Sequence, residues 1–302
     1  MMSEERQEFI IHHSSFIISH VGTLLDALKA LYPDSSATTL RKMLQGGRVR
    51  VNGEVEKDAK RIVEADEVVD VAQKVVQQTL PPELALLYED EAIFVVIKAH
   101  GLLTVATERE RENTAQAFLN DYLKRKGEGR IHIVHRLDRE TSGVLVFAKD
   151  FATRQALKAR FAAHDIERVY VAVIEGAMEK PSGTIRSHLR ERRDLRMESV
   201  DAHPDAKLAI THYRTIAAND RNSMLEVTLE TGRKNQIRAH LSEERHPIVG
   251  DRLYGSTSNP LGRLGLHAKF LGFDHPVTGE RMSFTAPVPK SFRDLFRVAE
   301  TD

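Results

Sequence analysis

Between residues 92 and 285 the sequence contains short apolar runs of strand length, separated by polar turns and by only a few segments of helical periodicity. Closely spaced strands of this kind favour an α+β fold with a central, mostly antiparallel sheet. Apolar periodicity predicts a helix over residues 114–126, and Asp150 is placed to cap another helix. The predicted strands cover residues 92–97, 144–147, 169–174, 185–189, 208–216, 224–229, 266–273 and 282–285.

Several functional classes are excluded or disfavoured by what the sequence lacks. It has no cysteine, which excludes disulfides, thiolate metal sites and cysteine nucleophiles. No Gly-x-Gly-x-x-Gly motif follows a predicted strand, which disfavours nucleotide-binding and methyl-donor folds. No apolar run approaches the roughly 18 residues of a spanning helix, so we expect no membrane association. The 44 basic and 44 acidic residues balance, and any RNA binding must therefore depend on local patches.

A small αα-β domain is predicted over residues 21–76. Leucines at helical spacing between residues 24 and 31 indicate a first helix. A second short helix follows at residues 39–44, and Gly46-Gly47 stands at the usual stop position. The alternating segment 48–53 then turns through Asn52-Gly53, a pair typical of β-hairpins.

The helix and strand of this small domain carry a basic patch. Residues 38–53 contain Arg41, Lys42, Arg48 and Arg50 and no acidic residue. One interpretation is a solvated face, which is what most charge clusters are. The other is a surface that binds RNA phosphates.

Three further segments complete the predicted organisation. Residues 1–20, which include a near-repeat around two Phe-Ile-Ile runs, are expected to form a poorly ordered extension. We hypothesise that native translation begins downstream, near Val21. Residues 77–83 are predicted to be a linker, because Gln77-Gln78 and Pro81-Pro82 interrupt the pattern, and residues 84–298 a larger catalytic domain.

Asp138 is the first candidate for chemistry. It lies between Arg136 and Arg139, in a charged loop that enters the predicted strand 144–147. A salt-bridged surface aspartate is one interpretation. The alternative is a catalytic carboxylate, because loops that enter buried strands commonly carry catalytic groups.

Two other residues are ambiguous when taken singly. Arg238 follows Ile237 at the edge of a predicted helix face, where it is either a snorkelling arginine or one held beside an acid. In the second case it would favour the ionised form of Asp138. Tyr170 stands in an apolar strand and is either a core tyrosine or an active-site residue.

Taken together, these motifs resemble the RluA-type RNA pseudouridine synthase family. The resemblance covers about residues 86–289 and rests on three motifs: His135-Arg136-Leu137-Asp138-x-x-Thr141-Ser142-Gly143, then Thr231-Gly232-Arg233-x-x-Gln236-Ile237-Arg238-x-His240-Leu241, then His246-Pro247-Ile248-x-Gly250-Asp251-x-x-Tyr254-Gly255. The small domain resembles the S-four RNA-binding domain through Leu40–Leu44, Gly47–Gly53 and an acidic turn at Ala65-Asp66-Glu67.

The resemblance implies a role for each of these residues. Asp138 would be the catalytic aspartate, Arg238 its ion-pair partner and Tyr170 the active-site tyrosine against the uracil. Arg136 would fill the space of a flipped nucleotide, and Arg233 would contact RNA. We expect no cofactor and no metal, because the isomerisation gains and loses no atoms.

An S-four-like domain ahead of the catalytic domain is similar to the branch that modifies large-subunit ribosomal RNA. We therefore expect a cytoplasmic monomer that converts specific uridines of ribosomal RNA to pseudouridine. The alternatives are transfer RNA as the target, a non-catalytic RNA-binding protein on the same fold, and another RNA-acting enzyme such as a methyltransferase. The arginine-rich stretch 186–196 either follows the phosphate backbone or is a solvated strand and loop.

The sequence departs from the family pattern at several positions. Lys98-Ala99-His100-Gly101 replaces Lys-Pro-x-Gly, and residues 102–111 lack a His-Pro feature. Asn235 stands where histidine is common, and Arg168 where lysine is common. We expect none of these positions to touch Asp138, Tyr170 or Arg238.

Overall fold

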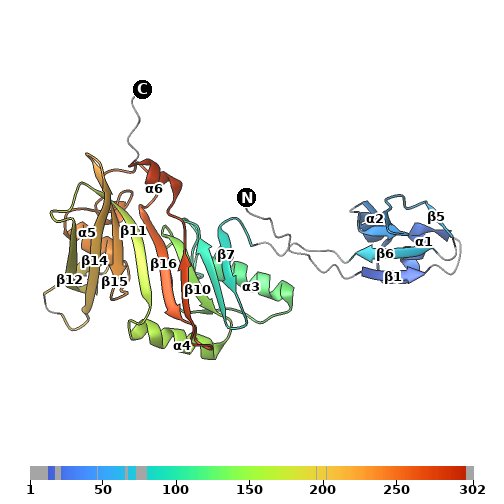
Figure 1. Cartoon of the computed structure of the whole chain (residues 1–302), viewed down its shortest axis with the longest axis horizontal. Coiled ribbons are helices and arrows are strands. Elements are labelled where there is room, and N and C mark those ends of the chain that lie inside the picture. The colour runs from blue at the N-terminus through green and yellow to red at the C-terminus, as the bar shows by residue number, and fades with distance from the viewer. Residues whose placement is uncertain are drawn as a thin grey trace, which may run out of the picture. The chain divides into compact units, whose positions relative to one another are not determined.

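The computed structural model describes residues 13–17, 22–45, 47–64, 67–72, 80–194, 196–201 and 203–296. The chain divides into two compact units, Met1–Gln77 and Gln78–Asp302, each with its own core (Figure 1). The predicted turn at Ala65-Asp66, part of the predicted linker and residues 297 and 298 lie outside the described residues.

The N-terminal unit, Met1–Gln77, combines two helices with short strands. Leucines of both helices pack against valines of the strands in one buried cluster, which confirms the predicted helices. The predicted hairpin is also confirmed, and Asn52 and Gly53 turn it with φ values of 50° and 86°. Its elements are β1 (His13–Ile17), β2 (Gly22–Thr23), α1 (Leu24–Leu31), α2 (Ala37–Gln45), β3 (Val49–Val51), β4 (Glu54–Val55), β5 (Ile62–Val63) and β6 (Val68–Ala72).

One expectation for this unit needs correction. We expected an extension without order over residues 1–20, but His13–Ile17 form β1, which pairs antiparallel with β6. The order of that sheet is β1-β6-β3-β4, so β1 satisfies backbone groups that an edge strand would otherwise leave unpaired. Such pairing is a long-range property that local periodicity does not reveal. Residues 1–12 and 18–21 lie outside the described residues.

The C-terminal unit, Gln78–Asp302, is built on one large sheet, and every strand predicted for it is present. Asp150 caps α4 as predicted, since its Oδ1 accepts the Thr153 backbone N–H at 2.8 Å. Its elements are β7 (Leu84–Glu89), β8 (Ile93–Lys98), α3 (Ala115–Lys126), β9 (His132–Ile133), β10 (Ser142–Ala148), α4 (Phe151–Ala162), β11 (Glu167–Glu175), β12 (Ser182–Glu191), β13 (Met197–Ser199), β14 (Lys207–Ala218), β15 (Asn222–Leu229), α5 (Gln236–Glu243), the 3-10 helix η1 (Arg252–Tyr254), β16 (Leu266–Asp274), β17 (Arg281–Thr285) and α6 (Lys290–Asp294).

The strand order is β13-β12-β14-β15-β11-β16-β10-β8-β7, with β9 and β17 attached to β10 and β16. All pairings are antiparallel except that of β10 with β16, which are parallel at Ser142 and Gly143. Gly143 has φ +122°, and a Cβ there would lie 2.1 Å from the Ala268 carbonyl oxygen. Only glycine therefore allows β10 to approach β16 directly after the Asp138 loop.

Helices cover the two faces of this sheet in pairs (Figure 1). One cluster packs α3 on β8 and β10, and another packs α5 on β11, β14 and β15, while Tyr170 contacts both clusters. The opposite face is covered by α4 and α6 through separate clusters. Tyr170 thus lies on the sheet between the regions that α3 and α5 cover. The candidate site lies on this part of the sheet.

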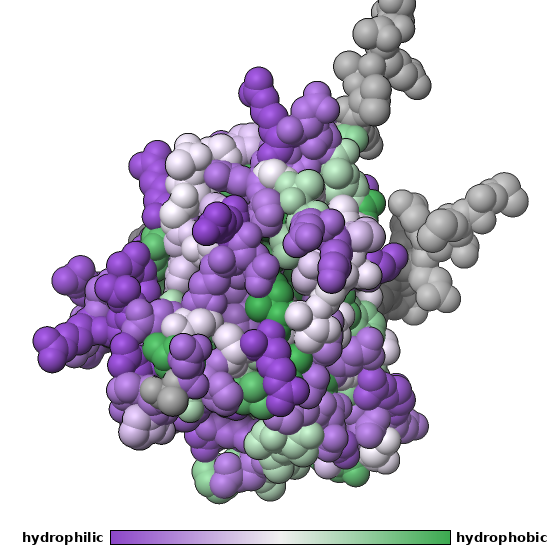
Figure 2. Space-filling view, turned by 90° about the vertical axis from the view of Figure 1, so that its left-hand side faces the viewer, coloured by the Kyte–Doolittle hydropathy of each residue, from purple (hydrophilic) through white to green (hydrophobic). Residues whose placement is uncertain are grey.

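The surface on the β12 and β14 side of this unit is mostly hydrophilic. Hydrophobic residues interrupt it only in small separate patches (Figure 2). No helix among the described residues is both long enough and apolar enough to span a bilayer.

Candidate active site

Asp138 lies in the loop between β9 and β10, and the backbone of this loop is held from both sides. The Thr141 N–H donates to the Asp138 carbonyl oxygen at 3.1 Å, which closes a turn around Asp138. The buried Thr104 hydroxyl accepts the Leu137 N–H at 3.2 Å and donates to the Leu137 carbonyl at 2.8 Å. The residue before Asp138 is therefore fixed by both of its backbone polar groups.

Lys98 holds the residue after Asp138. Its side chain is fully buried, and Nζ donates to the carbonyl oxygens of Leu102, Ala99 and Arg139 at 2.7, 2.8 and 3.1 Å. Burial lowers the pKa of Lys98 to about 7, against the opposing charges of Glu140 and Asp138. Lys98, from the segment 98–101 that departs from the family pattern, thus holds the backbone of the Asp138 loop through the Arg139 carbonyl.

Arg238, on α5, is the partner that the structure brings to Asp138. Its Nη1 lies 3.4 Å from Asp138 Oδ2. Its Nε and Nη2 donate to the two carboxylate oxygens of Asp251 at 2.7 and 2.8 Å. Burial lowers the pKa of Arg238, but the hydrogen bonds and charge of Asp251, with the charge of Asp138, raise it overall.

The two carboxylates on Arg238 differ in their exposure. The Asp251 side chain is 1% exposed, whereas that of Asp138 is 31% exposed. Asp251 therefore anchors the guanidinium, and Asp138 remains open to a ligand. Asp251 belongs to the third sequence motif, but nothing local in the sequence distinguishes an anchoring carboxylate thirteen residues after the arginine.

Asn235 requires a second correction. We expected it not to touch the central residues, but its Oδ1 accepts a hydrogen bond from Arg238 Nη1 at 3.1 Å. Asn235 precedes α5 with φ 50°, a left-handed conformation that asparagine tolerates better than most residues. With this backbone conformation, the side-chain amide of Asn235 folds back onto the first turn of α5, where it reaches Arg238, three residues later in the chain.

Arg168 also lies close to the centre. Its Nη2 donates to the carbonyls of Leu229 and Glu230 at 3.4 and 3.1 Å, directly before the Thr231–Lys234 loop. Burial raises the pKa of Tyr170, the positive charge of Arg168 partly opposes this, and the resulting pKa of Tyr170 is about 12. At neutral pH the Tyr170 hydroxyl is therefore protonated. The register of β11 on β16 shifts between Val169 and Tyr170, because Lys269 of β16 is an extra residue opposite them, as in a β-bulge.

Asp138, Tyr170, Asn235 and Arg238 line one cavity of about 310 Å³. The sequence-predicted residues Arg136, Asp138, Tyr170, Arg233 and Arg238 all line it. Arg136 is exposed, and Arg233 is tied back by a 3.0 Å hydrogen bond from its Nε to the Leu208 carbonyl. Apolar walls come from Leu137, Leu229, Ile237 and Leu266. A polar, charged centre with apolar walls is the usual form of a small-molecule or nucleotide site.

The other predicted RNA-binding residues belong to the N-terminal unit. Arg41 and Lys42 on α2 are exposed, as is Arg50 on β3, and Arg48 is half-buried. The cavity belongs to the other unit. Within the described residues, no cluster of three or more His, Cys, Asp or Glu side chains is arranged to hold a metal ion.

Comparison with known proteins adds two family matches. A model described as RNA pseudouridylate synthase matches residues 92–243, and a model described as S4 domain matches residues 23–69. The first match contains Asp138, Tyr170 and Arg238, and the second contains the four basic residues of the N-terminal unit.

Individual relatives extend over most of the chain. An uncharacterized RNA pseudouridine synthase of Bacillus subtilis is 34% identical over 257 residues, covering 83% of this chain and 90% of that protein. Ribosomal large subunit pseudouridine synthase D of Xylella fastidiosa is 35% identical over 305 residues, covering 93% of this chain and 90% of that protein.

A solved structure resembles the fold. The human protein titled RNA Pseudouridylate Synthase Domain Containing 4 aligns with a TM-score of 0.59 and 23% identity, over 69% of this chain and 90% of that chain. This likeness confirms the predicted α+β architecture of the larger unit.

Proposed function

The chain belongs to the RNA pseudouridylate synthase family, and we propose that Asp138 is the carboxylate with which it isomerises uridine to pseudouridine. The observation that carries this proposal is the meeting of Asp138 and Arg238, one hundred residues apart in the chain, at 3.4 Å in a cavity whose wall includes Tyr170. An intact set of ionisable groups around one cavity argues against a non-catalytic RNA-binding protein on the same fold.

The reaction breaks the N-glycosidic bond of a uridine, turns the uracil and rejoins it to the ribose through carbon. No atoms are gained or lost, so one carboxylate can begin and end the cycle. Asp138 would begin it by attack on the sugar or the base, or by removing a sugar proton. Its 31% exposure leaves its oxygens accessible, while Arg238 supplies a compensating positive charge.

A uridine within a helix must leave the stack to reach Asp138. A cavity of about 310 Å³ suits one nucleotide rather than a duplex. The protonated Tyr170 presents a ring to the uracil, and the exposed Arg136 at the cavity is suited to fill the space that the flipped nucleotide leaves. We propose that these two residues stabilise the flipped state.

The proposed substrate is large-subunit ribosomal RNA. This proposal rests on the relatives named for that substrate. It also rests on the S4 domain, whose solvent-exposed Arg41, Lys42 and Arg50 could bind RNA phosphates. Such a target would place the protein in the cytoplasm. Transfer RNA is the alternative substrate.

Substitution of Asp138 by asparagine tests the residue and the target in one experiment. A host lacking the protein is supplied with the original protein or with Asp138→Asn, and pseudouridines are mapped in ribosomal and transfer RNA. The original protein should restore modifications in large-subunit RNA, and Asp138→Asn should restore none, because it removes the charge but little volume. Restoration confined to transfer RNA would reassign the substrate.

The purified proteins provide the matched measurement. Tritium release from 5-tritiated uridine in ribosomal RNA should fall to background with Asp138→Asn, while RNA affinity stays within several-fold. Glu140→Gln is the control, because Glu140 is an exposed carboxylate two residues away that does not line the cavity. Undiminished turnover by Asp138→Asn would refute the assignment.

A further inference from the structure

Tyr254 lies where three parts of the C-terminal unit meet. It ends η1, the short helix that the side chain of Asp251 caps by accepting the Tyr254 N–H at 3.3 Å. Its carbonyl oxygen accepts a hydrogen bond from Ser242 of α5 at 2.7 Å. The side chain is buried against Leu189 of β12 and Ala239 of α5. Helix α5, helix η1 and strand β12 are thus joined at this one residue.

The ring of Tyr254 faces the arginine that meets Asp138. The guanidinium carbon of Arg238 lies 4.9 Å from the ring centroid. Asp251 holds two nitrogens of the same guanidinium, and its backbone leads directly into η1. The plane of the guanidinium is therefore supported by the ring while its edge is bound by a carboxylate. Together with the hydrogen bond that Asn235 accepts from Nη1, these two contacts hold Arg238 in the orientation that brings Nη1 to Asp138.

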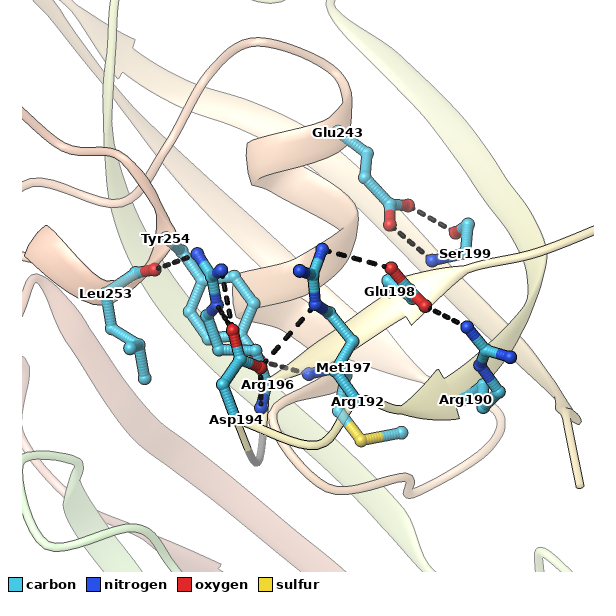
Figure 3. A network of polar contacts seen from close by, with 10 residues as sticks. All are labelled: Arg190, Arg192, Asp194, Arg196, Met197, Glu198, Ser199, Glu243, Leu253 and Tyr254. Carbon is cyan, nitrogen blue, oxygen red and sulfur yellow. Dashed lines mark hydrogen bonds and ion pairs between the residues drawn. The ribbon is translucent and has the colours of Figure 1, made fainter.

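The hydroxyl of Tyr254 points the other way, to the hairpin formed by β12 and β13, which we call the arginine hairpin (Ser182–Ser199). It accepts the backbone N–H of Met197 at 2.9 Å, at the start of β13 (Figure 3). The neighbouring Arg196 also reaches η1, where Nη1 donates to the Leu253 carbonyl at 3.5 Å. One end of the hairpin is thereby attached to the residue that supports Arg238.

Ion pairs link the two strands and the turn of the arginine hairpin. Arg190 and Arg192 both pair with Glu198 across the two strands, at 2.5 and 3.2 Å, and Arg196 pairs with Asp194 at 2.7 Å (Figure 3). Ser199 is bound in turn by Glu243 of α5 through its backbone N–H at 2.6 Å. Arg186 and Arg193 remain exposed on the hairpin surface.

We infer that Tyr254 is a positioning residue whose ring orients Arg238 toward Asp138 and whose hydroxyl ties that orientation to the arginine hairpin. The inference rests on the proposed function of Asp138. The two ends of the side chain have separable effects: the ring acts on the chemical step, and the hydroxyl acts on the arginine hairpin, whose exposed Arg186 and Arg193 can contact RNA phosphates. Tyr254 belongs to the third sequence motif, but nothing local in the sequence distinguishes a positioning tyrosine from a core tyrosine.

Two substitutions separate the ring from the hydroxyl. Tyr254→Leu removes both, and the single-turnover rate constant at saturating ribosomal RNA should fall about tenfold, the size expected of a partly desolvated cation–π contact. Tyr254→Phe keeps the ring, so the rate constant should stay within about twofold, while the RNA concentration for half-maximal rate rises about threefold, as loss of one hydrogen bond implies. Equal loss of rate in both variants would overturn the role of the ring.

A double-mutant cycle tests whether Tyr254 acts through Arg238. Arg238→Lys lacks the planar guanidinium, so adding Tyr254→Leu to it should lower the rate constant by less than about twofold further. A further tenfold loss in the double variant would show that Tyr254 acts independently of Arg238 and would reject the inference.

The control is Tyr122→Leu, which truncates another buried tyrosine, one that packs on Phe94 and bonds Glu89. Rates are normalised to the folded fraction from urea unfolding, and this variant should keep the rate constant within about twofold. A tenfold loss there would assign the Tyr254 effect to general destabilisation. Asp138→Asn in the same assay keeps the two proposals apart: its activity would refute the aspartate assignment whatever Tyr254 shows.

Discussion

The two groups that meet in the cavity are fixed in opposite ways. Asp138 is fixed through its backbone neighbours, whose carbonyl and amide groups are bound by the Thr104 hydroxyl and the Lys98 side chain. Within the part of the chain that the structure describes, its carboxylate pairs with Arg238 alone, at 3.4 Å. Arg238 is fixed through its own side chain, which Asp251, Asn235 and Tyr254 contact. The difference indicates an accessible carboxylate on a loop held through its backbone, opposed by a cation held through its side chain.

The arginine side of this comparison should be the easier one to break. Asp251→Asn removes the charge that balances a largely buried guanidinium and turns one acceptor oxygen into a donor. We expect the free energy of unfolding to fall by about 3 kcal/mol. The single-turnover rate should fall more than about a hundredfold, because displacing a group such as the Arg238 guanidinium by about 1 Å can slow a reaction by that much.

Urea unfolding and tritium release measure the two quantities for Asp251→Asn. The matched control is Asp274→Asn, which breaks surface pairs with Arg160 and Arg281 where Asp274 is 43% exposed. It should change stability by less than about 1 kcal/mol. An Asp251→Asn protein as stable as the original would contradict the anchoring role.

Changes to the groups that hold the Asp138 loop should lower stability and rate less than Asp251→Asn does, because a hydroxyl rather than a charge is lost. Thr104→Val leaves both backbone polar groups of Leu137 without their partner, which should lower stability by about 1–3 kcal/mol. The looser Asp138 loop should lower the rate about tenfold. The comparison is Thr153→Val, whose buried hydroxyl bonds the cap of α4 on the other face of the sheet. Thr153→Val should lose stability but not rate per folded molecule; equal rate losses would argue against a specific role for Thr104.

The prediction for Lys98 concerns stability alone and is visible as a pH slope. Its pKa is about 7 in the folded protein, against an ordinary value of 10.5. Between these values the unfolded chain binds one more proton, so the free energy of unfolding should rise as pH increases from about 7 to about 10. Lys98→Met should lack this contribution, and urea midpoints at several pH values measure the difference. Parallel curves for the two proteins would exclude it.

Sequence periodicity determined most of the architecture. Strands 169–174 and 224–229 were predicted because short alternating or continuous apolar runs are typical of buried strands, and Asp150 because a cap acts within one turn. The same local logic failed at His13–Ile17, which form β1 by pairing with a strand about fifty-five residues later. The motifs around Asp138 and Arg238 also identified the residues that line the cavity, through family resemblance rather than geometry.

Tertiary structure alone decided which groups hold those residues. Lys98 and Thr104 reach the Asp138 loop from segments more than thirty residues away. Asp251 and Asn235 bind the same Arg238 guanidinium that meets Asp138. Each contact depends on where a chain reversal places a side chain to within about 1 Å, whereas sequence patterns report only burial and local conformation. The reaction was therefore predictable from motifs that resemble a known family, while the contrast between a held arginine and an open aspartate required the fold.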